Sequence, residues 1–259
     1  MKEVFYVYQK LQMKNIIIGM KAYLGAFHLI SRLKLWKFFI VPMVISVVVA
    51  IVIAAFAYGL SDAIGDYIAS LWQWDSGREM FTLLSTFISA LLIIAIGLVL
   101  YKHTIMALSA PFMSPVSEKI ECYFMGHTAQ QRSTSFKEQL IRGLRVNFRN
   151  LFREIFFTLP ILLLGFIPVL GFLSTLLLFV VQAYYAGFGN MDYTLERHFT
   201  YRESITFVKQ HKGLAIGNGI VFMLFLLIPV IGVILVLPLS VTAATMTTIE
   251  KIHQKPAIE

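Results

Sequence analysis

Cysteine and charge are both scarce in this sequence, and each shortage limits what the protein can be. Cys122 is the single cysteine, so the chain can form neither an internal disulfide nor a cysteine-based metal cluster. Only 14% of the residues are charged, against 58% that are hydrophobic, and the mean hydropathy is +0.76. A soluble domain of similar length is far more polar. The composition therefore predicts an all-α integral membrane protein with a single membrane domain over residues 1–259.

The sequence also lacks the short motifs of familiar catalytic chemistry. Its histidines show no metal-ligand spacing such as HExxH, and no GxSxG elbow presents a serine nucleophile. A Walker-type phosphate loop is missing, so the chain does not encode ATP-driven transport. No carboxylate lies inside an apolar run. We therefore expect no enzyme activity, no catalytic residue, no metal site, no cofactor and no nucleic-acid partner.

Two uncharged runs have the length of ordinary transmembrane helices. These runs are residues 38–60 and 81–100, and a single crossing needs about 20 apolar residues. The connection between them is acidic and carries Trp72 and Trp74, which is typical of the outer side of a membrane. A basic cluster with a tryptophan, residues 31–37, precedes the first run. The pattern predicts two spanning helices joined by an outer loop.

Two further apolar runs, residues 155–183 and 214–249, are too long for one span and too short for two. Each contains a Pro-Val-x-Gly sequence near its middle, and proline ends a helix while glycine permits a tight reversal. Cut at this point, each arm of the first run has about 13 residues, or roughly 20 Å of helix, against about 30 Å of hydrocarbon. We therefore predict two re-entrant hairpins that penetrate the membrane partway. Their predicted apices are Pro168, Gly171, Pro229 and Gly232.

The distribution of lysine and arginine predicts which side each segment faces. There are seven before the first span, one in the acidic loop, eight from Lys102 to Arg153, four between the two broken runs and two at the end. The excess of positive charge marks the cytoplasmic side of a cell (inner) membrane, which places the amino terminus there. Residues 1–14 are predicted to be a flexible extension, followed by an interfacial amphipathic helix over residues 16–29. A helix break at membrane depth must be covered by protein or line a polar cavity, so we expect a homo-oligomer or a polar pathway.

A basic amphipathic helix is predicted after residue 135. Ser135 and Glu138 form a capping box, which marks the beginning of a helix. Four arginines then follow at spacings of three, four and four, which puts them on one helix face: Arg142, Arg145, Arg149 and Arg153. We expect this face to contact anionic membrane lipids.

Three ordered segments resemble the CysZ sulfate permease family. Residues 110–112 and 117–121 (APF and SEKIE) are similar to its APFxxxxxEKVE signature, and Asp192-Tyr193 with Arg197-His198 looks like its LDYPxDNH segment. The closing stretch is similar to its IPxxxxLxxPxxVxxAT pattern through Ile228, Pro229, Leu237, Pro238, Val241, Ala244 and Thr245. The resemblance covers about residues 16–249. It implies two long spanning helices, two partial hairpins, a homo-oligomer and sulfate uptake by a channel-like route without ATP.

The resemblance also implies where a small inorganic anion binds. In the family a PGLRR segment opens the first spanning helix, and the corresponding stretch here is residues 33–37, with Lys34 at the glycine of the motif. The implied anion-binding residues are Lys34, Leu35, Trp36 and Lys37. Lysine lacks the bidentate fork with which arginine holds an oxyanion, so this segment departs from the family pattern. Lys34 and Lys37 either bind the anion or anchor the helix to lipid headgroups. The sequence therefore leaves two functions open. If the lysines bind the anion, the protein is a permease for sulfate or a related oxyanion; if they anchor the helix, it is a non-transporting membrane scaffold or lipid-binding protein.

Overall fold

The structure is a computed structural model that describes residues 2–70, 78–126, 134–165, 167, 171–228 and 231–253. Helices account for all the regular structure in these residues, as the sequence predicted. In chain order they are α1 (Lys2–Arg32), the 3₁₀ helix η1 (Leu35–Phe39), α2 (Ile40–Ala69), α3 (Arg78–Leu108), α4 (Ala110–Met125), α5 (Phe136–Leu164), α6 (Gly171–Leu195), α7 (Tyr201–Gln210), α8 (Lys212–Leu226) and α9 (Ile231–His253).

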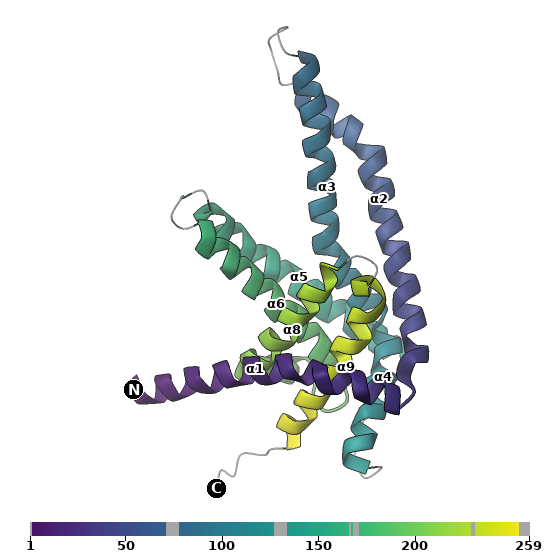
Figure 1. Cartoon of the computed structure of the whole chain (residues 1–259), viewed down its shortest axis with the longest axis vertical. Helices are drawn as coiled ribbons and strands as arrows, with labels where there is room; N and C mark the ends of the chain where they lie inside the picture. Colours follow the sequence, from purple (N-terminus) through teal and green to yellow (C-terminus); the bar gives the residue numbers. More distant parts are fainter. Residues whose placement is uncertain are drawn as a thin grey trace.

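α2 and α3 pack against each other and form a long hairpin that rises above the rest of the protein (Figure 1). α2 has 30 residues and α3 has 31. A helix of this length extends about 45 Å, which exceeds the hydrocarbon thickness of about 30 Å. The hairpin contains nearly all of the predicted spans 38–60 and 81–100, since only residues 38 and 39 belong to η1.

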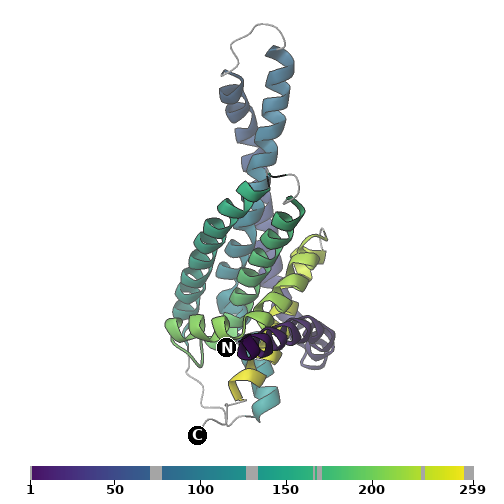
Figure 2. The ribbon, with the colours of Figure 1, turned by 90° about the vertical axis from the view of Figure 1, so that its left-hand side faces the viewer.

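Two shorter helix pairs lie beside this hairpin. α5 ends at Leu164 and α6 begins at Gly171, while α8 ends at Leu226 and α9 begins at Ile231. These helix ends lie on either side of the Pro-Val pairs at 168–169 and 229–230, and the predicted apices stay a prediction. Pro168 and Pro229 themselves lie outside the described residues, whereas Gly171 and Gly232 lie in the first turns of α6 and α9. Both pairs end short of the tip of α2 and α3 (Figure 2).

The arms of the first pair are longer than predicted. α6 has 25 residues, so the expectation of arms of about 13 residues is wrong for this helix. The reason is that α6 continues beyond the apolar run into a polar segment, including Asn190 and Asp192, which neighbouring helices bury. In the described chain, length and composition qualify three stretches as candidate membrane spans: Leu35–Ala69, Gly171–Leu195 and Leu235–His253. How deeply each hairpin enters the bilayer stays a prediction.

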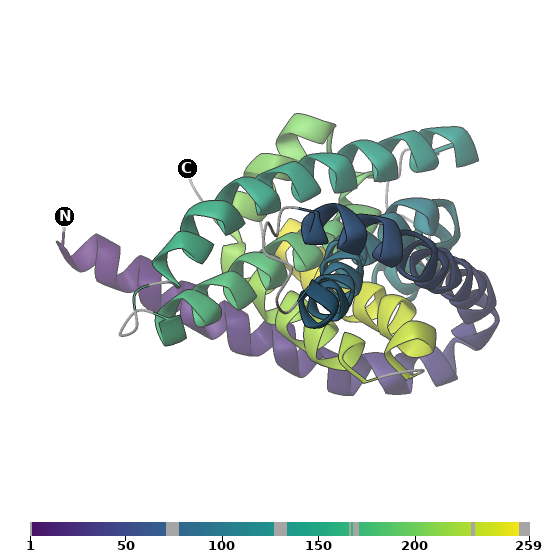
Figure 3. The same cartoon turned by 90° about the horizontal axis from the view of Figure 1, so that it is seen from above.

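α1 runs across the base of the bundle and packs against α8 and α9 (Figures 1 and 3). It begins at Lys2, so the structure is helical where the sequence predicted a flexible extension over residues 1–14. The helix is amphipathic: Ala26 and Ile30 are buried, while Leu24 and Phe27 are exposed. An apolar stripe left exposed on a helix that lies across the base fits a position in the membrane interface.

Small residues let α8 approach two other helices closely. A Cβ atom added to Gly217 would collide with the main-chain oxygen of Ile16 in α1, and one added to Gly219 would collide with that of Ala183 in α6. Glycines at such positions allow helix backbones to come into contact, as in the small-residue interfaces of membrane proteins. α8 is therefore held between α1 and α6 by main-chain contacts that a larger residue would prevent.

A buried hydrogen-bond network fastens the same helices. The Asn190 side-chain amide of α6 donates to Asn218 Oδ1 of α8 at 2.8 Å, and the Asn218 amide donates to the Ser240 carbonyl of α9 at 3.0 Å. The Tyr23 hydroxyl of α1 contacts the Asn218 carbonyl and Ser240 Oγ, each at 2.8 Å. Asn218 is thus an interhelical hydrogen-bonding residue, which is the common role of a polar residue in an apolar run.

Candidate functional site

The segments that resemble the family signature meet in one buried polar network. Glu121 of α4 is fully buried and receives a hydrogen bond from Arg197 Nη2 at 2.9 Å, and its other oxygen contacts His198. Arg197 Nη2 also donates to Ser117 Oγ at 2.7 Å. Ser117 Oγ lies 2.9 Å from Thr194 Oγ1. Residues from two of the three segments, about 80 positions apart in the chain, therefore form one cluster.

The third segment joins this cluster through α9. Thr194 Oγ1 lies 3.0 Å from Thr245 Oγ1, and the Thr245 hydroxyl donates to the Val241 carbonyl of its own helix at 2.8 Å. Burial raises the pKa of the Glu121 carboxyl, but the hydrogen bonds and charges of His198 and Arg197 outweigh burial and lower the pKa below its usual value. The network connects α4 and α9 to the carboxyl-terminal end of α6. Its charged groups, Arg197 and Glu121, are paired with each other.

Arg142 belongs to a second buried ion pair, between α5 and α6. Its Nε and Nη2 atoms donate to the two carboxylate oxygens of Asp192 at 3.0 Å each, and Nη2 also donates to Ser204 Oγ at 2.6 Å. Burial lowers the pKa of Arg142, but the Asp192 carboxylate more than offsets this and raises it. The prediction that all four arginines contact lipid is therefore wrong for Arg142. A spacing argument on one helix could not reveal a partner 50 residues away.

Glu196 lies one helical turn beyond Asp192 and has no comparable partner. Glu196 is 3% exposed, and its Oε1 atom has no hydrogen-bond partner within the described structure. Burial and the neighbouring Asp192 carboxylate raise the pKa of Glu196 to about 8, although Arg197 and Arg142 act in the opposite direction. Glu196 is thus a buried carboxyl group that takes up a proton near neutral pH.

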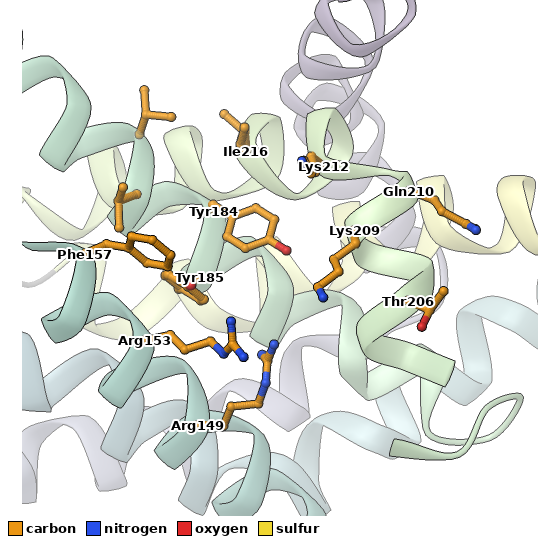
Figure 4. A pocket seen from close by; sticks show the side chains of 12 residues that line it. Arg149, Arg153, Phe157, Tyr184, Tyr185, Thr206, Lys209, Gln210, Lys212 and Ile216 are labelled. Atoms are coloured by element: carbon orange, nitrogen blue, oxygen red, sulfur yellow. The ribbon is translucent and has the colours of Figure 1, made fainter. Parts of the chain in front are cut away.

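The other three arginines of the predicted face remain more accessible. Arg145 lies over the Tyr201 ring, with its guanidinium carbon 5.6 Å from the ring centroid. Arg149 lies over the Phe188 ring at 5.1 Å and is half-buried, while Arg153 is exposed. Burial and the nearby Arg153 charge lower the pKa of Arg149. Arg149 and Arg153 point into a cavity between α5, α6, α7 and α8 (Figure 4).

This cavity has a volume of about 750 Å³ and a strongly cationic wall. Its lining residues are Arg149, Arg153, Phe157, Val180, Val181, Tyr184, Tyr185, Thr206, Lys209, Gln210, Lys212 and Ile216. Sequence reasoning identified the two arginines but missed the lysines and tyrosines, which come from other helices. Tyr184 and Tyr185, which follow the apolar run 155–183, were the feature of the sequence that could have indicated a polar site here.

The predicted anion segment forms the corner between α1 and α2. Lys34 adopts φ 52° and ψ 42°, the left-handed conformation that favours glycine, and it precedes η1 directly. The resemblance noted in the sequence aligns Lys34 with a glycine, the residue type that adopts this conformation most readily. Leu35 is buried, whereas Lys34, Trp36 and Lys37 are exposed. The Lys37 ammonium lies 5.4 Å from the centroid of the Phe38 ring.

The sequence did not predict a buried ion pair near the carboxyl-terminal end of α3. The Lys102 ammonium donates to Glu154 Oε1 at 2.7 Å, and His103 Nε2 lies 3.0 Å from Glu154 Oε2. The Lys102 and Glu154 side chains are each 2% exposed. This pair connects α3 to α5. Neither it nor any other group of acidic, histidine or cysteine side chains in the described residues has the arrangement of a metal site.

The apolar helices, the exposed apolar faces and the buried polar clamps define a helical membrane protein. The chain belongs to the family described as Sulfate transporter CysZ/Etoposide-induced protein 2.4, which matches residues 22–237. A relative from Pseudomonas aeruginosa (strain LESB58), named Sulfate transporter CysZ, is 26% identical over 246 residues. The alignment covers 92% of this chain and 97% of the relative. The matched family bears a transporter's name rather than that of an enzyme.

Proposed function

We propose that the protein is a permease that moves sulfate or a related oxyanion across the cell (inner) membrane without ATP. Membership of a family described as a sulfate transporter supports this proposal, as does alignment over nearly the whole length of a relative with that name. The absence of a Walker-type loop from the sequence supports the ATP-independent route. We further propose that the protein is multi-pass, with a cytoplasmic amino terminus, and works as a homo-oligomer in contact with membrane lipids.

The observation that carries the proposal is the conformation of the corner at Lys34. This residue adopts a left-handed turn although it is not glycine, and two exposed lysines flank the start of η1. A non-glycine residue in this conformation costs about 1–2 kcal/mol, which is tolerated where the surroundings or the function require the turn. This turn presents Lys34 and Lys37 at the entrance of α2, where an anion would meet two ammonium groups.

The exchange of arginine for lysine sets an expectation for selectivity. Arginine binds a tetrahedral oxyanion through two parallel N–H groups, whereas lysine acts as a point charge. We therefore propose that the protein accepts sulfate and related oxyanions with weaker discrimination than a site built on two arginines. Replacing Trp36 and Lys37 with arginine should raise the affinity for sulfate by about tenfold, the effect of one additional charge-assisted hydrogen bond.

Flux of radiolabelled sulfate into liposomes containing the purified protein tests the proposal. We expect flux well above that of empty vesicles, and a loss of most of it in Lys34→Gln/Lys37→Gln. Lys14→Gln/Lys21→Gln on α1 removes the same charge from exposed positions elsewhere and serves as the matched control. Flux equal to that of empty vesicles would instead favour the second candidate, a non-transporting membrane scaffold or lipid-binding protein. The cationic cavity on α5 is the observation that favours this alternative.

A further inference from the structure

We propose that the cavity between α5, α6, α7 and α8 binds an anionic phospholipid, with its phosphate among the basic side chains and the beginning of its acyl chains along an apolar wall. This inference goes beyond transport, because the cavity shares no lining residue with the turn at Lys34 to Lys37. It rests on the charge, the polarity gradient and the size of the cavity, and on its place in the fold.

The cavity gathers positive charge without acidic compensation. Arg149, Arg153 and Lys209 point toward the same part of it (Figure 4), and Lys212 adds a fourth positive charge to the lining. None of the lining residues in the described structure is acidic. Elsewhere in the described residues, Lys102, Arg142 and Arg197 form ion pairs with carboxylates. Like charges brought together in a partly buried site repel one another, so a bound anion is the partner that would stabilise this arrangement.

The cavity changes from polar to apolar in the same direction on three helices. Along α5, the arginines at 149 and 153 are followed by Phe157 toward the tip of the hairpin. Along α6, Val180 and Val181 lie on the tip side of the tyrosine pair at 184 and 185. Along α8, Ile216 lies one turn beyond Lys212 toward its apex. Arg149 and Phe157 are eight residues apart, so the gradient extends over about 12 Å.

An amphiphile fits this gradient, whereas a free inorganic anion uses only one end of it. The volume of about 750 Å³ corresponds to roughly 25 water molecules in the liquid and lies in the range of sites for drug-sized ligands. A single tetrahedral anion would fill a small part of this space and leave the apolar wall uncovered. A phospholipid headgroup with the first part of its chains matches both the volume and the change in polarity.

The position of the cavity in the fold gives the lipid the right orientation. α7 lies at the end of the α5 and α6 pair that is farthest from its helix break (Figure 2), and α1 lies across the same end of the bundle. The apolar end of the cavity faces the tips, where Phe156, Leu159 and Leu163 are exposed on α5. The charged end therefore lies at the level of the amphipathic helix α1, and the apolar end points to the membrane interior, as a lipid in a bilayer requires.

Thermal unfolding of the purified full chain in an uncharged detergent tests the proposal. A ligand that binds the folded state raises the unfolding temperature in a saturable way. We expect this from short-chain phosphatidylglycerol, and not from phosphatidylcholine with the same chains. Arg149→Gln/Arg153→Gln should weaken the apparent affinity by about a hundredfold, or tenfold for each charge-assisted hydrogen bond that the substitutions remove. Lys14→Gln/Lys21→Gln, with the same reduction of charge on α1, should leave the affinity unchanged.

A second variant and further ligands distinguish lipid binding from the alternatives. If the double arginine variant does not fold, Lys209→Gln/Lys212→Gln removes two exposed charges from the same cavity and should weaken phosphatidylglycerol binding in the same way. Equal stabilisation by phosphatidylcholine would overturn the proposal, as would unchanged binding in both cavity variants. Stabilisation by sulfate or glycerol 3-phosphate that is as strong as that by phosphatidylglycerol, and that is lost in the cavity variants, would also overturn it, since the cavity would then recognise a free anion rather than a lipid.

Discussion

Arg142 of α5 and Asp192 of α6 form a bidentate ion pair, with both nitrogen–oxygen distances at 3.0 Å. The side chains are 15% and 6% exposed, so water screens the pair little. The guanidinium also donates to the Phe199 carbonyl at 2.8 Å, which ties the segment after α6 to α5. This residue pair therefore fixes the packing of the first hairpin at the end away from its helix break.

Asp192→Asn should destabilise the protein by about 3 kcal/mol, because it leaves a largely buried guanidinium without its counter-charge. The double variant Arg142→Met/Asp192→Leu should lose less than the single variant, since no unpaired charge remains. Unfolding in detergent, followed by circular dichroism, measures both. Arg145→Met, on the same helix but more exposed, is the control. A double variant less stable than Asp192→Asn would contradict this account of the pair.

The close approach of α8 to α6 predicts a strong effect at Gly219. Gly219→Ala should cost about 1–3 kcal/mol, because the new Cβ collides with the main-chain oxygen of Ala183 and the helices must separate. Gly59→Ala in α2 is the matched control, since nothing lies within 4 Å of a Cβ there. This variant should stabilise the protein by about 0.5–1 kcal/mol through helix propensity. Similar effects of the two substitutions on the unfolding temperature would argue against the close approach.

The raised pKa of Glu196 predicts a stability that falls as the pH rises. The folded protein keeps this carboxyl protonated up to about pH 8, whereas the unfolded chain ionises it near 4.5. Between these values the folded state binds more protons, so increasing the pH across this window destabilises it, by roughly 1–3 kcal/mol. Glu121 acts oppositely at acid pH, because its lowered pKa makes stability fall as the pH drops below the usual carboxyl range.

Glu196→Gln separates these two effects, because it imitates the protonated carboxyl. The variant should be more stable than the natural protein at pH 8 and should lose the decline between pH 5 and pH 8. Its unfolding temperature, measured at intervals of one pH unit, shows this directly. Glu118→Gln, at an exposed position on α4, should keep the decline. An unchanged decline in Glu196→Gln would assign the pH dependence to another group.

The turn at Lys34 allows stability and function to be separated. Lys34→Gly should raise the stability by about 0.5–1 kcal/mol, because glycine adopts φ 52° without steric cost, partly offset by its flexible unfolded state. Lys37→Gly inside η1 should instead lower the stability by about the same amount. The test measures both the sulfate flux and the unfolding temperature of each variant. Lys34→Gly should be more stable yet transport less, and equal or greater flux would remove Lys34 from the anion site.

Sequence reasoning succeeded where the determining information is local. The two apolar runs 38–60 and 81–100 can be recognised from their length and composition alone, and α2 and α3 contain nearly all of both. The capping box at Ser135 begins α5 as predicted. Local patterns also located the segments that resemble the family, which matches most of the chain.

Sequence reasoning failed where the partner of a residue lies far away in the chain. The direction of Arg142 depends on Asp192, and the burial of Lys102 depends on Glu154. The cavity could not be foreseen either, because it forms only when Lys209 and Lys212 are brought to the arginines of α5. In an apolar chain each charged side chain must find water, lipid headgroups or a partner, and periodicity alone does not distinguish these three outcomes.

The connections within the three helix pairs, α2–α3, α5–α6 and α8–α9, differ in charge, and this has a consequence for membrane insertion. The connections at 165–170 and 227–230 contain no charged residue, whereas the connection between α2 and α3 includes Asp75. Moving a charged group through hydrocarbon is costly, but an uncharged turn meets no such barrier. In the proposed topology the membrane insertion machinery would translocate one charged segment, and the two shorter hairpins would enter afterwards from the side on which they were synthesised.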